Sequence, residues 1–395
     1  MILPFAISRL PRIVFGAGSI CQLPDLAAPY GKRVLLVTGV SSFENSRFFQ
    51  PFLDELKKKA FSWEHIRVRG EPSPQFIDEQ VQFLKGAGIS VVIGIGGGSA
   101  LDAAKAIAGL LFPGNSVMDH LEGIGPEVPY RGPSVPFLAI PTTAGTGTEA
   151  TKNAVLSQRG PNGFKKSFRS ELLVPQYAIV DPDLLSTCPR SLIAADGMDA
   201  LTQLIESFVS LNANPFTDSL ALDAIQKVWQ NLPVMFETEG RDPTAQAGMA
   251  YGALISGVTL AQAGLGAVHG LASPLGAFFP IPHGVVCGTL LAASTATNIR
   301  ALRARNPQSP ALAKYAGLGR IFSQKPDLEF ADAWEALVQG LLERTQQLGL
   351  PGLGKFGVAD ADLEMLIAKC RAGSMKTNPI TLHDEELIEI LKSRL

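Results

Sequence analysis

The sequence lacks a basic field, a long apolar run and a signal-peptide core, and each absence removes a class of function. Its 34 lysines and arginines against 36 aspartates and glutamates leave a net charge of −2, which does not attract nucleic acid or an anionic membrane. No apolar run approaches the ~18 residues that a membrane span needs. Arg9 and Arg12 interrupt the apolar N-terminus, so no signal-peptide core forms.

Cysteine is also scarce, which excludes a disulfide framework. The sequence holds only four cysteines, far apart and without a C-x-x-C pair: Cys21, Cys188, Cys287 and Cys370. We interpret them as reduced thiols and expect a cytoplasmic protein without nucleic-acid or membrane partners. The remaining composition, 46% hydrophobic and 18% charged, is that of a globular protein. A length of 395 residues allows two domains with sizeable cores.

The first half of the chain alternates short apolar runs with helical patterns. Near-continuous Val, Ile and Leu runs predict buried parallel strands at 33–39 and 89–98, and another apolar run at 135–141 predicts a third strand. Helical spacing follows the first two strands, at 48–60 and 99–112. Strands alternating with helices predict a right-handed, doubly wound parallel sheet, that is, a Rossmann-like α/β domain.

The pattern changes near residue 187, where the last strand-like segment, 177–185, has ended. From 191 onward the periodicity is helical and the β-branched runs are absent. We therefore predict an α/β domain at 1–187 followed by an all-helical domain at 188–395.

A triple glycine ends the second predicted strand and opens a helix. The absence of a Cβ at Gly97 and Gly98 lets the backbone approach a ligand, and a helix N-terminus attracts phosphate. Ser99 is placed as the N-cap, and Asp102 completes an S-x-x-D capping box. The segment is neither G-x-G-x-x-G nor a P-loop. It indicates a pyrophosphate cradle, or else only a tight turn.

A second loop of this kind, 141–151, follows the third strand. Its hydroxyl groups suit hydrogen bonds to sugar and phosphate oxygens. The candidate residues are Thr142, Thr143 and Thr146. Alone it would be equally well explained as a threonine-rich surface turn. Two such loops at the same edge of one sheet favour a dinucleotide crevice.

Histidine is rare, yet two of the five histidines lie fourteen residues apart in a Gly-, Pro- and otherwise apolar segment. They are His269 and His283. Upstream, Asp199 and Gln203 are spaced i and i+4, on one otherwise apolar helix face. One carboxylate and two imidazoles would suit iron or zinc (Fe²⁺ or Zn²⁺). The alternative is a pair of satisfied core histidines.

These segments together resemble the iron-containing (group III) alcohol dehydrogenase family. The motifs "GGGSALDAAK", "PTTAGTGTEAT", "IVDPDL", "GMDALTQLIE" and "VHGLASPLG…IPHG" stand in the family's order over nearly the whole chain. The resemblance implies an NAD(P)-binding α/β domain, a helical domain that binds one divalent metal ion, catalysis between them, and a homodimer.

The resemblance also implies roles for individual residues. Asp199, His269 and His283 match the family's metal ligands. The pyrophosphate loop corresponds to Gly97, Gly98 and Ser99, and the second cofactor loop to Thr142, Thr143 and Thr146. Asp102 is expected near the nicotinamide end, in a catalytic role, and Lys166 near the cofactor.

Three positions depart from the family pattern. Gln203 stands where the fourth metal ligand is usually histidine, so it either ligates weakly or leaves that position to water. Ser273 stands where many relatives carry a histidine that relays the alcohol proton. Ser273 is a catalytic candidate, but a serine hydroxyl is no general base near neutral pH without a partner. The proton would then pass through water, the ribose hydroxyl or Thr and Ser groups, or the chemistry is tuned to a different substrate. Gly39 replaces the aspartate that bonds the adenosine ribose in NAD-preferring relatives, and Ser41 and Ser42 follow it. This favours NADP over NAD.

The expected reaction is hydride transfer between NAD(P)(H) and a small alcohol or aldehyde, the metal acting as Lewis acid on the substrate oxygen. Phe278, Phe279 and Phe168 are candidates for an apolar wall around the substrate, or are ordinary core residues. One alternative is a lyase resembling dehydroquinate synthase, or a polyol-phosphate dehydrogenase, although 191–211 and 248–299 lack Lys and Arg for a substrate phosphate. Another is a catalytically impaired NAD(P)-binding protein.

Overall fold

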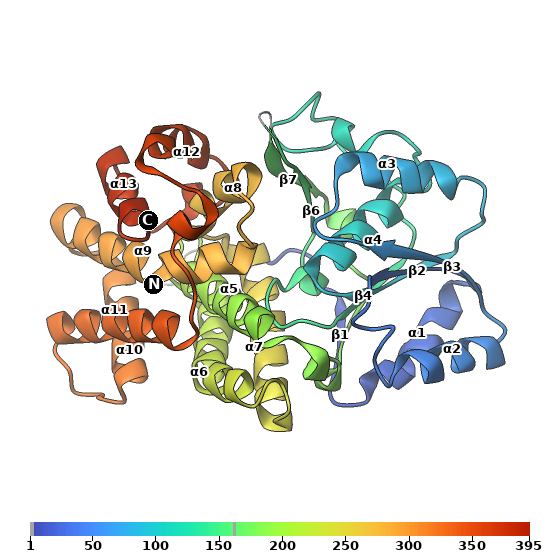
Figure 1. The fold of residues 1–395 in the computed structure, drawn as a ribbon, viewed down its shortest axis with the longest axis horizontal. Helices are drawn as coiled ribbons and strands as arrows, with labels where there is room; N and C mark the ends of the chain where they lie inside the picture. The colour runs from blue at the N-terminus through green and yellow to red at the C-terminus, as the bar shows by residue number, and fades with distance from the viewer. Residues whose placement is uncertain (1–3, 161–162) are drawn as a thin grey trace.

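The computed structural model describes residues 4–160 and 163–395, which form an α/β part and a helical part side by side (Figure 1). The α/β part is built on a six-stranded parallel sheet in the order β1-β8-β5-β4-β2-β3. The strands are β1 (Arg12–Phe15), β2 (Arg33–Gly39), β3 (Ser62–Val68), β4 (Val91–Gly96), β5 (Phe137–Pro141) and β8 (Tyr177–Val180).

Helices cover both faces of this sheet, which confirms the doubly wound prediction. In β2, Val34 and Leu36 belong to the core beneath α1 (Leu23–Ala27) and α2 (Phe49–Lys58). The alternate residues Leu35 and Val37 pack with α3 (Pro74–Phe83) and α4 (Gly98–Leu110) on the opposite face. Successive side chains of a strand point to opposite faces, so a strand buried on both reads as the continuous apolar run seen at 33–39.

The sequence prediction missed four strands. Two of them, β1 and β3, form the edges of the sheet. Strand β1 has only 4 residues, and polar side chains interrupt the apolar pattern of β3. The other two, β6 (Asn153–Gln158) and β7 (Phe164–Arg169), form a separate antiparallel hairpin. This hairpin matters for function because β7 reaches the helical part, where it contacts α8.

Among the described residues, no strand follows Val180. A 3₁₀ turn, η6 (Pro182–Thr187), leads into the helical part. Its helices are α5 (Arg190–Val209), α6 (Pro215–Glu237), α7 (Pro243–Ala263), α8 (Ala267–Phe278), α9 (His283–Arg305), α10 (Pro310–Ser323), α11 (Phe330–Gln347), α12 (Leu363–Cys370) and α13 (Asp384–Lys392). The all-helical character expected for the second half is therefore confirmed.

Helix α9 is long and apolar enough to cross a membrane by length and composition, which corrects the sequence expectation that no segment is. However, 83% of its most apolar window is buried inside the molecule. The pair α7 and α8 also passes this test only if it is counted as one span, and it is bent by 101°. Burial against neighbouring helices accounts for the apolar character of α9, which forms part of the core that holds the site.

Candidate active site between the two domains

The predicted cofactor loops lie together at one edge of the sheet. They follow β4 and β5, which are neighbouring parallel strands, so their carboxyl ends share an edge. A Cβ on Gly98 would lie 2.8 Å from the side chain of Thr146, and one on Gly97 would lie 3.2 Å from Thr143. The loops therefore pack against each other, and glycine is required at 98 by that close approach.

The end of β2 joins the same edge, because a Cβ on Gly96 would lie 3.2 Å from the backbone nitrogen of Gly39. Ser41 and Ser42 follow and are exposed. Within the two loops, Gly97, Gly98, Ser99, Thr143 and Thr146 are partly exposed. Thr142 differs, since it is buried and its backbone N–H donates to the Gly96 carbonyl over 3.0 Å.

The capping interpretation of Ser99 is wrong. Helix α4 begins one residue earlier than predicted, so Gly97 is its N-cap and no side chain caps the helix. Ser99 is the second helical residue, too far along to serve as an N-cap with Asp102 as its partner. The first-turn backbone N–H groups are consequently not used by a side-chain cap, which fits an anion-binding helix N-terminus.

Asp102 and Lys105 lie on the buried side of α4. Burial raises the pKa of Asp102 to about 7, although Lys105 opposes that rise. The Lys105 ammonium is fully buried and donates to the backbone carbonyls of Thr148, Thr151 and Asn153, each over 2.8 Å. Lys105 thus ties α4 to the end of the second cofactor loop.

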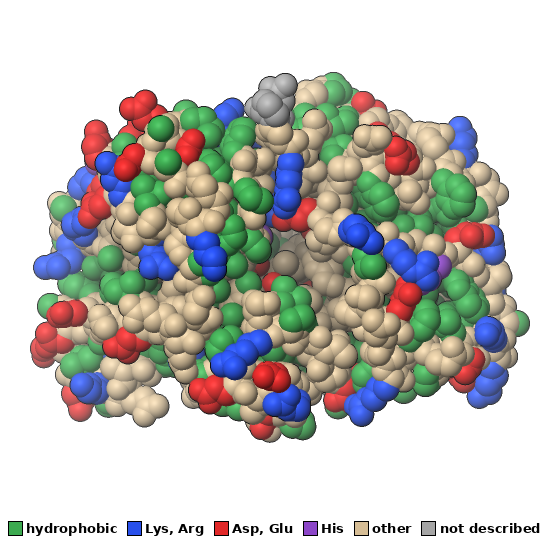
Figure 2. All heavy atoms as spheres, viewed as in Figure 1, with side chains coloured by type: hydrophobic (Ala, Val, Ile, Leu, Met, Phe, Trp, Pro, Cys, Tyr) green, Lys and Arg blue, Asp and Glu red, His purple; other side chains and the backbone are tan. Residues whose placement is uncertain are grey.

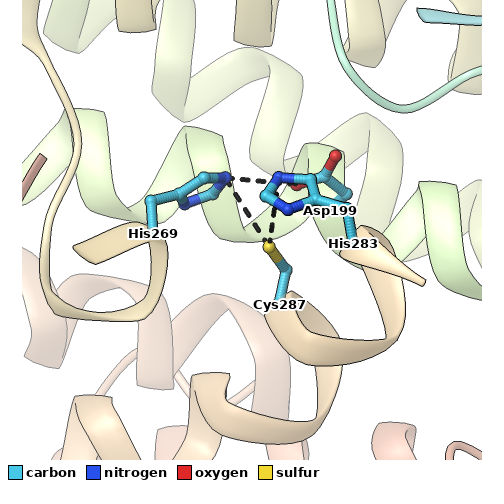
Figure 3. Close-up of side chains that lie close together, drawn as sticks. All are labelled: Asp199, His269, His283 and Cys287. Atoms are coloured by element: carbon cyan, nitrogen blue, oxygen red, sulfur yellow. Dashed lines mark hydrogen bonds and ion pairs between the residues drawn. The ribbon is translucent and has the colours of Figure 1, made fainter. Parts of the chain in front are cut away.

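The predicted metal ligands converge, and a fourth donor joins them (Figure 3). Asp199 on α5 places its Oδ1 3.2 Å from His269 Nε2 and 3.8 Å from His283 Nε2. The Cys287 Sγ lies 3.6 Å and 3.7 Å from the same two nitrogens. All four ligand atoms fall within 4.8 Å of one another, a spacing and a donor set that fit one divalent metal ion.

Local structure explains this convergence. His269 lies in the first turn of α8, while His283 and Cys287 lie one turn apart at the start of α9. The segment between the two helices contains Pro280 and Pro282, and Pro282 is the N-cap of α9. Sequence reasoning missed Cys287. The i, i+4 spacing from His283 was the signal that could have found it.

Glu206, also missed, orients His269. Its Oε2 lies 2.6 Å from His269 Nδ1, and its Oε1 accepts from the backbone N–H of Val268 over 2.7 Å. A carboxylate on Nδ1 directs Nε2 toward the cluster, as is typical around ligating histidines. A Cβ on Gly266 would lie 3.0 Å from the same carboxylate, so that glycine leaves room for Glu206. The sequence feature that could have indicated Glu206 is its position, seven residues after Asp199 on an otherwise apolar helix.

The protonation states of Asp199 and His283 suit ligation. Burial alone would raise the pKa of Asp199, but His283 and His269 outweigh it and lower that pKa to about 2. Burial, reinforced by the Lys165 charge, lowers the pKa of His283 to about 4. At neutral pH the carboxylate is therefore ionised and this imidazole is neutral. Burial raises the pKa of Cys287 to about 12, so ligation there requires loss of a proton.

Gln203 and Ser273, the two departures in the metal region, are both engaged in the protein. The Gln203 amide oxygen accepts from Ser256 Oγ over 2.7 Å. The Ser273 hydroxyl donates to the backbone carbonyl of Lys165 over 3.1 Å. A hydroxyl held by a backbone carbonyl has no base to activate it, so Ser273 positions β7 against α8.

The adjacent lysines of β7 face opposite ways. Lys165 forms an ion pair of 2.6 Å with Glu71, and its charge acts on His283 and Asp102. The Lys166 ammonium instead lies 3.5 Å from the point where a Cβ on Gly123 would be. Strand alternation separates the two, and Lys165 is the one on the side of the metal-binding cluster.

Of the three phenylalanines considered for a substrate wall, Phe168 does not belong there. It is fully buried in the α/β core and stacks on His120 with ring centroids 5.2 Å apart. Phe278 and Phe279 are partly buried at the end of α8, packed against the helical core. The molecular surface is hollowed between the two domains, with acidic and basic side chains around the hollow (Figure 2).

Comparison with known proteins matches both halves of the chain to one family. A model described as iron-containing alcohol dehydrogenase matches residues 11–182, and one described as the C-terminal part of the Fe-containing alcohol dehydrogenase family matches 193–395. The chain belongs to the iron-containing alcohol dehydrogenase family. Membership makes it an oxidoreductase acting on CH–OH groups, with a nicotinamide cofactor and an iron-type metal, as the resemblance implied.

Individual relatives of this alcohol dehydrogenase cover nearly its full length. Alcohol dehydrogenase 4 of Saccharomyces cerevisiae is 30% identical over 97% of this chain and 96% of its own. The NAD-dependent methanol dehydrogenase of Bacillus methanolicus is 29% identical over 98% of both. The crystal structure of a 1,3-propanediol oxidoreductase has a TM-score of 0.89 at 26% identity and covers 100% of both chains. Neither the lyase alternative nor the binding-only alternative is supported by these relatives.

Proposed function

We propose that this alcohol dehydrogenase uses NADP(H) in preference to NAD(H) to interconvert a small alcohol and its aldehyde, with one divalent metal ion, Fe²⁺ or Zn²⁺, in the cluster of Asp199. The observation that carries the proposal is the convergence of Asp199, His269 and His283 on α5, α8 and α9. Asp196, one turn before Asp199, lies against the second cofactor loop, since a Cβ on Gly145 would be 2.7 Å from its Cβ. Adjoining turns of α5 would therefore hold the metal and contact the loop that would bind the cofactor.

Different residues of the site have different roles in the proposed hydride transfer. Gly97 and Gly98 present bare backbone to the pyrophosphate, and the partly exposed hydroxyls of Thr143 and Thr146 lie beside them. When bound, the metal ion supplies Lewis acidity toward the substrate oxygen. Glu206 keeps His269 in place. Because Ser273 is held by a carbonyl, we expect the alcohol proton to come from water at His283, whose side chain is 25% exposed.

The preference for NADP rests on Gly39. At the end of β2 it offers no carboxylate to repel a 2′-phosphate, and the exposed Ser41 and Ser42 can donate to one. A relative from Clostridium saccharobutylicum, 29% identical, is named as an NADPH-dependent butanol dehydrogenase, whereas the methanol dehydrogenase above is named as NAD-dependent. The family alone therefore leaves the choice open, and the β2 terminus favours NADP.

Gly39→Asp is expected to reverse this preference. A Cβ at this position would meet only Ser42 Oγ, at an ordinary 3.8 Å, so the substitution is tolerated sterically. The new carboxylate should raise the Kd for NADPH at least about 10-fold, by charge repulsion, and leave the Kd for NADH equal or lower. Fluorescence titration of both cofactors, with elemental analysis and an aldehyde panel, tests the proposal. Tighter binding of NADH than of NADPH by the wild type would contradict the NADP assignment.

We also propose a homodimer. Strand β1 is an edge of the sheet, and it carries the exposed side chains Ile13 and Phe15. An edge strand with exposed apolar side chains is a surface on which a second copy can pair. Sedimentation equilibrium should give twice the chain mass, and a monomer at micromolar concentration would contradict the proposal. We place the enzyme in the cytoplasm, where its four free cysteines would stay reduced, and cell fractionation tests this.

A further inference from the structure

We propose that Cys287 is a protein ligand of the bound metal ion and that its thiolate fills the position that Gln203 does not. The inference rests on the proposed function in one respect, namely that the cluster of Asp199 binds a divalent ion. It goes beyond that function because it names a sulfur donor and, with it, the class of metal that the site selects.

The donor atoms are spaced as the ligands of one tetrahedral ion would be. Metal bonds of about 2.0 to 2.1 Å to N or O and about 2.3 Å to S give tetrahedral edges of about 3.3 to 3.6 Å. The Cys287 Sγ lies 3.6 Å from His269 Nε2 and 3.7 Å from His283 Nε2. Asp199 Oδ1 completes two further edges of 3.2 Å and 3.8 Å to the same nitrogens. The sulfur therefore lies at ligand spacing from both imidazoles, and Figure 3 shows it pointing at them.

The contacts of the Cys287 sulfur are with members of the cluster. Its side chain is fully buried, and the polar groups beside its sulfur are those of His269, His283 and Asp199. A structural thiol of a helical core would instead face apolar side chains or a backbone carbonyl. Cys370 shows that arrangement, because its Sγ donates to the Ile367 carbonyl over 3.2 Å. The placement of Cys287 is that of a ligand.

Gln203 is directed elsewhere. It shares a helix face with Asp199, yet its amide oxygen accepts from Ser256 Oγ on α7 over 2.7 Å. Ser256 Oγ in turn lies 3.4 Å from the Gly145 carbonyl of the second cofactor loop. Gln203 thus connects α5 to α7 near the cofactor loop, while α9 supplies the additional metal donor.

A thiolate changes which ion the site prefers. Thiolate is a softer donor than imidazole or carboxylate, and an Asp, two His and Cys set has the ligand types of zinc sites. When the ion binds, the S–H bond breaks, the proton passes to solvent and the sulfur–metal bond forms. Together the thiolate and the Asp199 carboxylate then balance the two charges of the ion. The structure thus points to Zn²⁺ as the better fit.

X-ray absorption at the zinc edge of the zinc-loaded full-length enzyme tests the assignment directly. We expect one sulfur scatterer at about 2.3 Å beside N/O scatterers at about 2.0 to 2.1 Å. Cys287→Ser should lose the sulfur scatterer. Its affinity for zinc should fall by more than the about 10- to 100-fold that is typical when a residue supporting a metal ligand is removed. Cys188→Ser, at another buried cysteine, is the matched control, and Gln203→Ala tests the competing ligand. Both should keep the sulfur shell.

A wild-type spectrum with only N/O scatterers would overturn the assignment. This measurement does not depend on the folding of any variant. Loss of zinc affinity in Gln203→Ala with no loss in Cys287→Ser would also overturn it. Neither outcome touches the proposed function, since an N/O-bound ion with NADPH-linked aldehyde reduction would leave that function intact. Conversely, a sulfur-bound zinc in an enzyme that reduces no aldehyde would uphold the ligand and refute the reaction.

Discussion

Asp199→Asn should lower kcat/KM for aldehyde reduction at least about 1,000-fold, a loss of about 4 kcal/mol of transition-state stabilisation. The carboxylate is an ionised donor of the cluster, and its Oδ1 lies near both imidazoles. Asparagine keeps the size of the side chain and removes the charge. The variant should therefore fold like the wild type yet bind less metal, which elemental analysis and steady-state kinetics measure together.

Ser273→Ala is the matched control for that experiment. It lies on α8 one turn after His269, and its hydroxyl donates to the Lys165 carbonyl. We expect less than about a 10-fold change in kcat, because one partly buried hydrogen bond is worth about 1 kcal/mol and no proton passes through it. A loss in Ser273→Ala as large as that in Asp199→Asn would restore serine to a catalytic role and refute this interpretation.

Lys105→Met should destabilise the protein by about 3 to 5 kcal/mol, the range found when one partner of a buried charged group is removed. The ammonium donates to three backbone carbonyls around the second cofactor loop. It is also the cation beside two buried acids, Asp102 and Glu149. Urea unfolding measures the loss. Lys152→Met is the control, because Lys152 pairs with Glu171 near the surface and should cost under about 1 kcal/mol.

The loss of unfolding free energy caused by Lys105→Met should increase with pH. Burial raises the pKa of Asp102 and of Glu149 to about 7, above their ordinary values, even though Lys105 opposes both rises. The folded state holds these two protons to higher pH than the unfolded chain does, so the contribution of Asp102 and Glu149 to wild-type stability falls as the pH rises from about 4 to about 7. Without the ammonium both pKa values rise further and the fall continues above pH 7. A penalty that is equal at pH 6 and pH 8 would show that only the hydrogen bonds matter.

The scarcity of histidine and the order of the motifs are enough to locate much of the site. His269 and His283 stand out because histidine is rare and because the segment is otherwise apolar. The two glycine- and threonine-containing loops can be placed together because both follow parallel strands, which end at one edge. The sequence does not predict which neighbouring element a given side chain faces. Lys165 and Lys166 are adjacent in sequence, and only the packing of β7 on α8 decides which one faces His283.

Cys287 and Glu206 show the same limit in the metal region. Each is one or two helical turns from a residue that the sequence pattern singles out, so each has a spacing signal. Nothing along the chain says which helix face meets which, however. The turn through Pro280 and Pro282 brings the start of α9 against α8, and Gly266 leaves the space that Glu206 occupies. The contacts of Glu206 with α8 join segments more than sixty residues apart.

Sequence patterns alone were enough to identify the fold class and the family, and to predict the two cofactor loops and the three metal ligands Asp199, His269 and His283. Hydrophobic period, glycine spacing and motif order are local properties, and these features depend only on them. The directions of side chains between elements depend on how the elements pack. That packing turned Gln203 toward Ser256, tied Ser273 to a backbone carbonyl and placed the Cys287 sulfur beside both imidazoles. Such outcomes arise from packing α5, α7, α8, α9 and β7 together, which no local pattern encodes.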